Sequence, residues 1–143
     1  AATAEDLAPN RALSWDDAFF IRWLDDVEPN FPPAIHVHSW PASQAALAQV
    51  RKNTWPVAVR FESYLNGVEL CNAFLELNDG DEQRKRFTQA NAYRSANGDK
   101  PHPIDEDFLA AVGVLPTTAG IALGVERLVA ALLNLDGIAQ LQV

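Results

Sequence analysis

Cysteine, positive charge and long apolar runs are scarce in this sequence, and each shortage excludes a class of protein. Its 143 residues include a single cysteine, Cys71, so no disulfide can form within the chain, which fits a reducing cytoplasm. No apolar run approaches the roughly 20 residues of a membrane span. Residues 1–10 are small and acidic, unlike a secretion signal, which is basic and then apolar. We therefore expect a cytoplasmic protein without a membrane segment.

Positive charge is outnumbered, because 11 Lys and Arg residues face 19 Asp and Glu residues and leave a formal net charge of −8. A field of that sign repels phosphates, so tRNA and other nucleic acids are not expected as partners. The basic triplet from Arg84 to Arg86 is interpreted as a solvated helix face.

The apolar content, 48%, is enough for the core of one domain. Residues 1–13 are expected to form a flexible leader. Ser14 with Asp17 predicts the start of a helix, and the prolines from Pro29 onward predict its end. A strand is expected over residues 35–40. The Ala-rich segment 43–50 predicts one or two helical turns.

The centre of the chain has the clearest pattern. Residues 57–65 and 68–77 are strand candidates on either side of Asn66-Gly67, which favours a two-residue hairpin turn because both positions must accept positive φ. Asp79 then predicts the cap of a polar helix over residues 80–97, with Gly98 just beyond its end.

The last third predicts a helix over residues 106–112, a buried strand over 119–123, and a helix that opens at Gly124. Apolar residues recur in this last helix with a period of 3.6; they are Val125, Leu128, Val129, Leu132 and Leu133. The order of elements indicates an antiparallel sheet with helices packed against it, an α+β domain.

The hairpin carries polar residues of types that are depleted in strands, so each requires a reason. They are Glu62, Glu69, Asn72 and Glu76. A two-residue turn pairs Glu62 with Cys71 and Tyr64 with Glu69, which makes Glu62 and Glu69 diagonal neighbours on one face. Carboxylates that close repel each other unless a cation lies between them. Paired carboxylate oxygens suit Mg²⁺, whose coordination substrate phosphates complete.

Asn72, Phe74 and Glu76 share a parity that Glu69 does not, so a regular strand would place them on the other face. A β-bulge near residues 70–71 would bring them all together, and we predict that bulge. The alternative is that one face is exposed to solvent and its acids have no function. Parity alone does not separate the two interpretations.

A second unusual segment runs from Gly120 through Ala122 and Gly124 to Arg127. Small residues at alternate positions leave a strand face on which a flat ligand or a second backbone can lie. Arg127 falls in the first turn of the next helix, where a guanidinium and a helix N-terminus can both meet phosphate. Spacing alone favours a tight strand–helix junction with the arginine in a salt bridge.

Together these segments resemble the class II lysyl-tRNA synthetases. Residues 60–84 are similar to their lysine-binding hairpin, Gly120 to Arg127 is similar to their motif 3, and the resemblance runs from about Leu13 onward. Within that family, residues 41–49 and 102–105 are closer to the elongation factor P–lysine ligases. So is Ala122, because ordinary lysyl-tRNA synthetases usually have glycine there.

The resemblance implies a partial class II synthetase core over residues 14–143 that uses ATP and Mg²⁺. Glu62 and Glu69 would bind the metal against the ATP phosphates. Gly124 would line the nucleotide site, and Arg127 would stack on adenine or bind the γ-phosphate. The amino-acid carboxylate would attack the α-phosphorus to give an aminoacyl-adenylate, with catalysis by charge neutralisation and positioning.

The resemblance also implies an amino-acid pocket for lysine or β-lysine. Asn72 would contact the polar backbone end of the substrate, Phe74 its methylenes, and Glu76 its ε-ammonium, which needs an anion when buried. Gly120 and Ala122 would line the floor, and the added methyl of Ala122 would favour β-lysine. The acceptor would be elongation factor P.

The sequence departs from the family pattern, because motif 1, which builds the dimer interface of these homodimers, and motif 2, which supplies an arginine to the α-phosphate, are not found. We therefore expect a C-terminal half that does not catalyse adenylation alone. One alternative is a non-catalytic interaction module that uses an exposed sheet edge. Another is a fragment of a true lysyl-tRNA synthetase, against which Ala122 and the missing basic surface argue.

Overall fold

The computed structural model of this protein describes residues 13–141. The expected flexible leader therefore lies outside the described residues, apart from Leu13. The described chain divides into two compact parts, which we treat separately. The first part comprises residues 13–37, 62–71 and 123–141, and the second part comprises residues 38–61 and 72–122.

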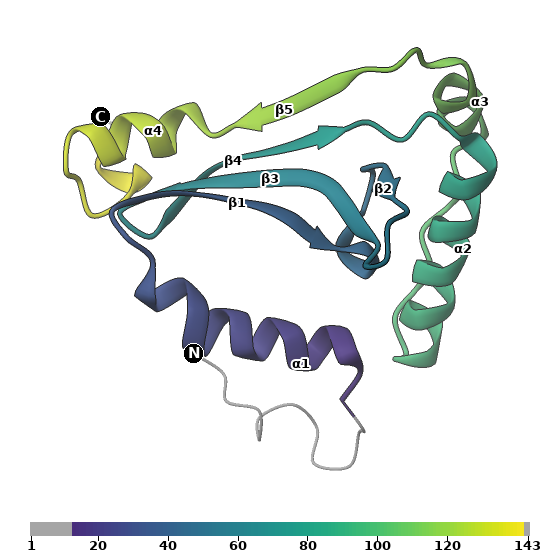
Figure 1. Ribbon diagram of the computed structural model, residues 1–143, viewed down its shortest axis with the longest axis horizontal. Helices are drawn as coiled ribbons and strands as arrows, with labels where there is room; N and C mark the ends of the chain where they lie inside the picture. The colour runs from purple at the N-terminus through teal and green to yellow at the C-terminus, as the bar shows by residue number, and fades with distance from the viewer. Residues whose placement is uncertain (1–12, 142–143) are drawn as a thin grey trace. The chain divides into compact units, whose positions relative to one another are not determined.

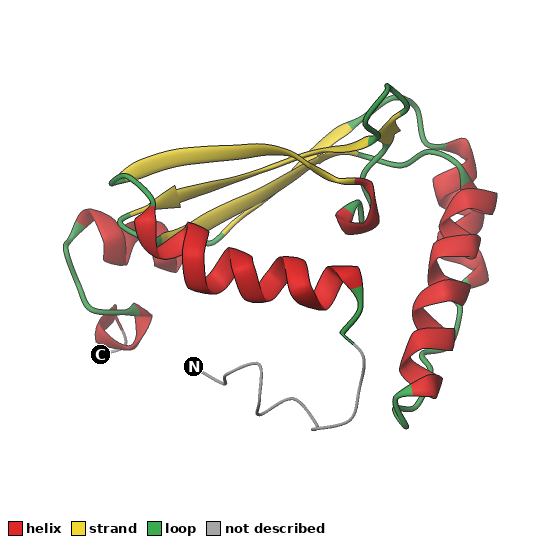
Figure 2. Ribbon diagram, turned by 60° about the horizontal axis from the view of Figure 1, so that its bottom comes forward, coloured by secondary structure: helices red, strands yellow, loops and turns green. Residues whose placement is uncertain are grey.

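A sheet is the main element of the fold, and its strands lie in the order β1-β3-β4-β5, with the short β2 paired to β3 (Figures 1 and 2). The strands are β1 (Ala34–Pro41), β2 (Val50–Arg51), β3 (Val57–Leu65), β4 (Val68–Leu75) and β5 (Ala119–Leu123). The pairs Glu76 with Thr118 and Leu70 with Gly124 run in opposite directions along β4 and β5, as antiparallel strands require. The prediction of an α+β fold with an antiparallel sheet is confirmed. The prediction that residues 119–123 form a buried strand is wrong about burial, since Ile121 is 63% and Leu123 48% exposed on β5.

The hairpin between β3 and β4 is confirmed at its turn. Asn66 and Gly67 have φ of 50° and 75°, the left-handed conformation that a tight two-residue turn demands. The N–H of Asn66 also donates to the carbonyl of Pro33, 2.7 Å away, which ties the turn to the start of β1.

Two helices belong to the first part, α1 (Trp15–Arg22) and α4 (Val125–Leu132). Ser14 and Asp17 form the reciprocal hydrogen bonds of a capping box at the start of α1. Gly124 is the N-cap of helix α4, where the sequence predicts the helix to open, but the apolar face of α4 is exposed: Val125 is 58% and Leu132 66% exposed. Between residues 13 and 141, no helix combines the length and the apolar character needed to cross a membrane.

Helices α2 (Gly80–Ala96) and α3 (Glu106–Val114) belong to the second part and lie side by side (Figure 1). Asp79 caps α2 and Asp105 caps α3, each through its carboxylate. Gly98 follows α2 with a φ of 82°, as predicted. Helix α3 continues two residues beyond the expected end at residue 112, because the small Gly113 does not interrupt it.

The expected helical turns over residues 43–50 are wrong. Only Ala42–Gln44 forms a short 3-10 turn. Ala46 and Leu47 then form a turn in which Ala46 has a φ of 48°, and the chain is paired with its neighbours from Ala48 onward. Its backbone pairs with neighbouring strands instead, since the N–H of Gln49 donates to Leu75 and the N–H of Leu77 donates to Leu47. Tertiary pairing therefore overrides the helix propensity of the alanines.

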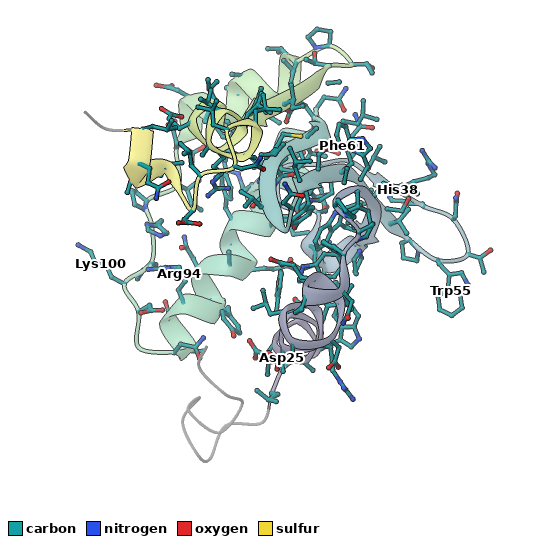
Figure 3. All side chains as sticks on the ribbon, turned by 90° about the vertical axis from the view of Figure 1, so that its left-hand side faces the viewer. Asp25, His38, Trp55, Phe61, Arg94 and Lys100 are labelled. Carbon is teal, nitrogen blue, oxygen red and sulfur yellow. The ribbon has the colours of Figure 1, made fainter. Side chains whose placement is uncertain are left out.

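The loop after β2 carries Trp55, which projects into solvent and is 81% exposed (Figure 3).

The bulge in β4 stays a prediction. The hydrogen bonds between β4 and β5 keep one register, since Leu70 and Glu76 on β4 and Gly124 and Thr118 beside them are six residues apart on each strand. In the register set by the turn, Arg60 opposes Ala73, so Phe74 of a regular strand would lie on the other face. The guanidinium carbon of Arg60 nevertheless lies 5.5 Å from the centre of the Phe74 ring. The distance shows that the long Arg60 side chain reaches the ring, but it does not establish an extra residue in β4.

Candidate functional site

The predicted site residues separate between the two compact parts according to their predicted roles. The residues expected to bind metal and nucleotide all lie in the first part: Glu62, Glu69, Gly124 and Arg127. The residues expected to bind the amino acid all lie in the second part: Asn72, Phe74, Glu76, Gly120 and Ala122. Each set is described within its own part.

In the first part, Glu62 is buried on β3 and is held by a neighbour on the same strand. The hydroxyl of Tyr64 donates a hydrogen bond of 2.6 Å to Oε2 of Glu62, and both side chains are buried. The ring of Phe31 packs edge-on against Tyr64, with 5.0 Å between ring centres. A buried carboxylate needs such donors, and this one orients the predicted metal ligand.

Several carboxylates act on the Tyr64 hydroxyl. Burial raises the pKa of Tyr64 above its ordinary value, and the hydrogen bond to Glu62 and the charges of Glu62, Glu28 and Glu69 raise it further. The charges of Glu62 and Glu69 therefore both act on this hydroxyl, while the shared metal site stays a prediction. Glu28 joins them from the segment after α1, where its carboxylate accepts a hydrogen bond from the indole of Trp23.

Arg127 lies in the first turn of α4 and contacts Glu69 twice. Its Nη1 donates to the backbone carbonyl of Glu69 over 3.1 Å and lies 3.7 Å from the Oε2 of the same residue. Both side chains are partly exposed, at 50% and 39%. The salt bridge that spacing alone favours is therefore present, and it also joins two predicted nucleotide ligands at a surface that solvent reaches.

Gly124 packs against the Arg127 side chain, so its Cα is not open to a nucleotide. Its N–H donates to the carbonyl of Leu70 over 2.8 Å, which fixes the strand–helix junction to β4. A Cβ at residue 124 would lie 3.3 Å from Cδ of Arg127, so the stem of the arginine packs on the glycine backbone. The absence of a side chain at Gly124 thus sets the path of the guanidinium.

In the second part, the backbone of Glu76 is fixed from two sides just beyond β4. Its N–H donates to the carbonyl of Thr118 over 2.9 Å, and its carbonyl accepts from the side-chain amide of Gln49 over 3.0 Å. It also forms a bridge with Ala48. Glu76 is therefore rigidly placed, although it lies at the end of a strand.

The carboxylate of Glu76 lies directly on Gly120. A Cβ at residue 120 would be 3.1 Å from Cδ of Glu76 and closer still to Oε1, so the acid occupies the space that a side chain would fill. Glu76 is half-buried. Across residues 13–141, neither a cation nor a hydrogen-bond donor pairs with this carboxylate.

Asn72, four residues earlier on β4, is also unsatisfied. Its Oδ1 is buried and has no hydrogen-bond partner within the described part of the chain. A buried carbonyl oxygen without a donor costs about 1–3 kcal/mol, so such groups in native proteins call for a reason.

Phe74 lies between these two residues in the sequence, and its ring is near a cation. The guanidinium of Arg60 is 5.5 Å from the Phe74 ring and 4.6 Å from the ring of the buried Trp40. Nη1 of Arg60 also donates to the carbonyl of Gln44 over 2.8 Å. The planar cation thus fixes the ring that is predicted to contact the substrate methylenes.

Two further features limit the chemistry of the site. Ala122 is exposed on β5, and no contact of its methyl group tests the predicted preference for β-lysine.

Within residues 13–141, no three His, Cys, Asp or Glu side chains are grouped to hold a metal ion. A magnesium ion here would therefore need oxygen ligands from its substrate, as the pairing of Glu62 with Glu69 predicts.

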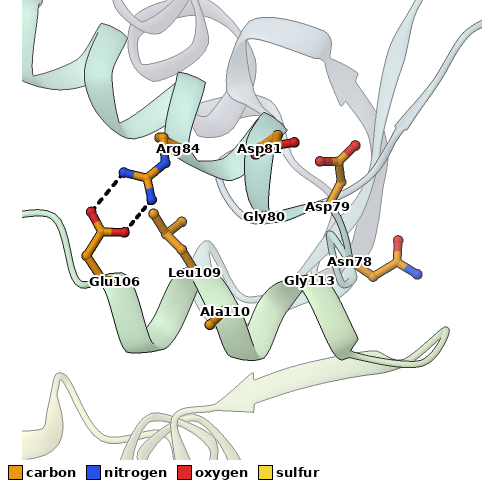
Figure 4. Close-up of a pocket in the computed structure, with 9 residues that line it drawn as sticks. All are labelled: Asn78, Asp79, Gly80, Asp81, Arg84, Glu106, Leu109, Ala110 and Gly113. Carbon is orange, nitrogen blue, oxygen red and sulfur yellow. Dashed lines mark hydrogen bonds and ion pairs between the residues drawn. The ribbon is translucent and has the colours of Figure 1, made fainter.

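A separate open hollow of about 670 Å³ lies between the start of α2 and α3 (Figure 4). It is lined by Asn78, Asp79, Gly80, Asp81, Arg84, Glu106, Leu109, Ala110 and Gly113. None of the predicted site residues is among them. Arg84 spans it in a bidentate pair with Glu106, which lowers the pKa of that carboxyl through the hydrogen bond from Arg84. The hollow is therefore the junction between two helices, and the exposed Arg84–Glu106 ion pair joins the helices there.

Sequence reasoning missed three residues that support the site: Glu28, Arg60 and Tyr64. Arg60 and Tyr64 flank Glu62 at a spacing of two, so the alternation of a strand places all three on one face. That parity could have identified both residues. Glu28 gives no local signal, because only the tertiary fold brings it to β3.

Comparisons with known proteins identify the family of the chain. The family described as tRNA synthetases class II (D, K and N) matches residues 19–143. An elongation factor P–(R)-β-lysine ligase of Pectobacterium atrosepticum is 50% identical over 107 residues, which make up 72% of this chain and 33% of that protein. A protein of the same name from Histophilus somni is 47% identical over 117 residues, or 80% of this chain and 36% of that protein.

The chain therefore spans about a third of the length of the curated relatives that it matches. The match to the family extends over most of the sequence and includes both the hairpin and the segment from Gly120 to Arg127. The predicted resemblance is confirmed. This chain belongs to the class II tRNA synthetases of the D, K and N type.

Proposed function

We propose that the chain supplies amino-acid-binding and nucleotide-binding elements of an ATP-dependent ligase for lysine or β-lysine. The activated amino acid is an aminoacyl-adenylate, and its acceptor is elongation factor P, the protein that the names of the relatives contain. The enzyme works in the cytoplasm, as the single buried cysteine suggests.

One observation carries the proposal: two acceptors on and just beyond β4 have no donor in the described part of the chain. They are the buried Oδ1 of Asn72 and the half-buried carboxylate of Glu76. An anion and an amide oxygen without donors suit a ligand that brings positive N–H groups. Lysine has an ammonium group at each end of an apolar stem, and Phe74 lies between the two acceptors in sequence.

The first part of the chain supports the nucleotide half of the proposal. Glu62 and Glu69 are two hard-oxygen ligands, and Mg²⁺ bound between them would neutralise phosphate charge. Arg127 is already oriented by Glu69 and Gly124. The guanidinium is half exposed, so it can exchange its contact with Glu69 for a phosphate oxygen.

The adenylation step needs positioning rather than a covalent enzyme group. A carboxylate oxygen of the amino acid attacks the α-phosphorus of ATP, the bond to the β-phosphate oxygen breaks, and pyrophosphate leaves. Glu76 and Asn72 hold the amino acid, and Arg127 holds the nucleotide. No motif 2 arginine is available in this sequence for the α-phosphate, so we expect the isolated chain to bind its ligands without turnover.

Calorimetry tests this proposal with the whole 143-residue chain. ATP with Mg²⁺ should bind at least weakly, and Arg127→Ala should abolish that binding. Arg51→Ala, which removes an exposed arginine from β2, is the matched control and should bind as the parent chain does. Equal binding by the parent chain and Arg127→Ala would refute the assignment of Arg127.

A second candidate, a non-catalytic interaction module, is favoured by the open face of α4. Val125, Leu132 and Leu133 are 58%, 66% and 61% exposed there. Exposed apolar residues in such a row mark a surface that another chain can cover. The same calorimetry separates the candidates, because an interaction module binds neither ATP nor lysine.

A further inference from the structure

Gly120 is the residue whose surroundings differ most from the role that the family resemblance implies. A floor residue leaves its Cα open to the ligand. Here the carboxylate of Glu76 already covers that position, with Cδ 3.1 Å from where a Cβ would stand. Gly120 therefore contacts the acid proposed to bind the ammonium, and any effect on the substrate passes through that acid.

We propose that Gly120 is a positioning residue that seats the Glu76 carboxylate, and that glycine at this position sets the selection of a cationic side chain. The proposal rests on the proposed function, because Glu76 selects an ammonium only if the ligand is lysine-like. The seat itself depends only on the geometry of β4 and β5.

The glycine is required for space rather than for its backbone conformation. Gly120 has no positive φ, so alanine could adopt the same extended backbone. Alanine is even preferred to glycine within a strand, because it loses less conformational entropy on folding. The only obstacle to a methyl group is the side chain of Glu76.

Glu76 cannot avoid that methyl group by moving its backbone. The N–H of Glu76 is bonded to Thr118, two residues before Gly120 on the neighbouring segment. The carbonyl of Glu76 is bonded to Gln49 on its other side. The Glu76 side chain must therefore adopt a different rotamer. Its carboxylate then moves away from the position proposed to bind the ammonium.

A double-mutant cycle tests the seat without any ligand. Gly120→Ala should lower the midpoint of thermal unfolding by a few degrees at most, because the group that must move is the end of a flexible side chain. The same change in a Glu76→Ala background should leave the midpoint unchanged or raise it, since the obstacle is gone. Gly113→Ala, where a Cβ meets nothing within 4 Å, is the control and should not lower the midpoint. Additive effects of the changes at residues 76 and 120 would overturn the proposal.

A second measurement tests the effect on selection. Calorimetry compares lysine with norleucine, which has the same stem without the ε-ammonium. The parent chain should prefer lysine, and Gly120→Ala should reduce that preference at least tenfold. An unchanged preference in Gly120→Ala would overturn the inference. A third outcome is that the parent chain does not prefer lysine, while the unfolding midpoints still show coupling between residues 76 and 120. That outcome would support the role of Gly120 in positioning Glu76 and would overturn the proposed function.

Discussion

The hydroxyl of Tyr64 donates a 2.6 Å hydrogen bond to the carboxylate of Glu62, and both side chains are buried on one face of β3. This pair shows how the hairpin can carry an acid in its interior. The phenol supplies a hydrogen-bond donor to the carboxylate at a position that burial shields from water. Tyr64 is therefore part of the candidate site, although it contacts no predicted substrate group.

Replacing Tyr64 with phenylalanine should destabilise the fold. The change keeps the ring but removes the donor from a buried carboxylate, which costs about 1.5–3 kcal/mol in the free energy of unfolding. Urea denaturation measures the loss. Tyr93→Phe is the matched control because Tyr93 is 48% exposed, and it should change stability by less than about 0.5 kcal/mol. Equal effects of the two substitutions would contradict the role of the hydrogen bond.

The raised pKa of Tyr64 predicts a loss of stability in alkali. The unfolded chain releases the phenolic proton near the ordinary pKa of 10.0, whereas the folded chain keeps it because of burial and the nearby carboxylates. Above that pH the unfolded state binds fewer protons than the folded state, so the free energy of unfolding falls as pH rises. Denaturation at several pH values in metal-free buffer should show this fall in the parent chain. In Tyr64→Phe the slope should be smaller; an unchanged slope would show that another group is responsible.

Gly80 should be essential for the packing of α2 on α3. A Cβ at residue 80 would lie 2.7 Å from the backbone carbonyl oxygen of Leu109, which a side-chain rotation cannot relieve. Gly80→Ala should therefore cost about 1–3 kcal/mol in the free energy of unfolding. Gly113→Ala on α3 has open space and should stabilise the helix by up to about 1 kcal/mol. Opposite signs for these two glycine-to-alanine changes, read from urea midpoints, are the expected result. A stable Gly80→Ala chain would contradict the close contact.

Replacing Arg60 with lysine should destabilise the fold. Lysine keeps the charge but lacks the planar group that lies against Trp40 and Phe74 while donating to Gln44. Arg60→Lys should cost about 1–2 kcal/mol in the free energy of unfolding and should shift the near-ultraviolet circular dichroism of the aromatic rings. Arg51→Lys, at an exposed position on β2, is the control and should change neither quantity. An unshifted aromatic spectrum for Arg60→Lys would show that the cation does not fix the rings.

Local signals in the sequence predicted most of the fold. Asn66-Gly67 predicted the hairpin because few dipeptides accept two positive φ values, and Ser14 and Asp79 marked helix starts through their side-chain acceptors. The segment from residue 43 to 50 misled the prediction because alanine favours a helix locally, while the decisive hydrogen bonds come from Leu75 and Leu77. Long-range pairing of that kind leaves no local trace.

The sequence proposes the members of the candidate site, which stay predictions, but it does not give their contacts with one another. Parity predicts a shared face for Glu62 and Glu69, and the family resemblance implies the amino-acid set. Neither could show that Glu76 covers Gly120 or that Arg127 packs on Gly124. Those contacts depend on rotamers and on the spacing between neighbouring strands, which sequence periodicity does not encode.

The most direct test of the account is the binding of lysine to the chain before and after Glu76→Gln. The substitution keeps the size and shape of the side chain and removes the negative charge, which is the feature proposed to attract the ε-ammonium. Calorimetry should show that the parent chain binds lysine more tightly than norleucine, and that Glu76→Gln binds both equally. If the parent chain does not distinguish the two amino acids, or if Glu76→Gln keeps the preference for lysine, the claim that β4 carries a pocket for a cationic amino acid is wrong.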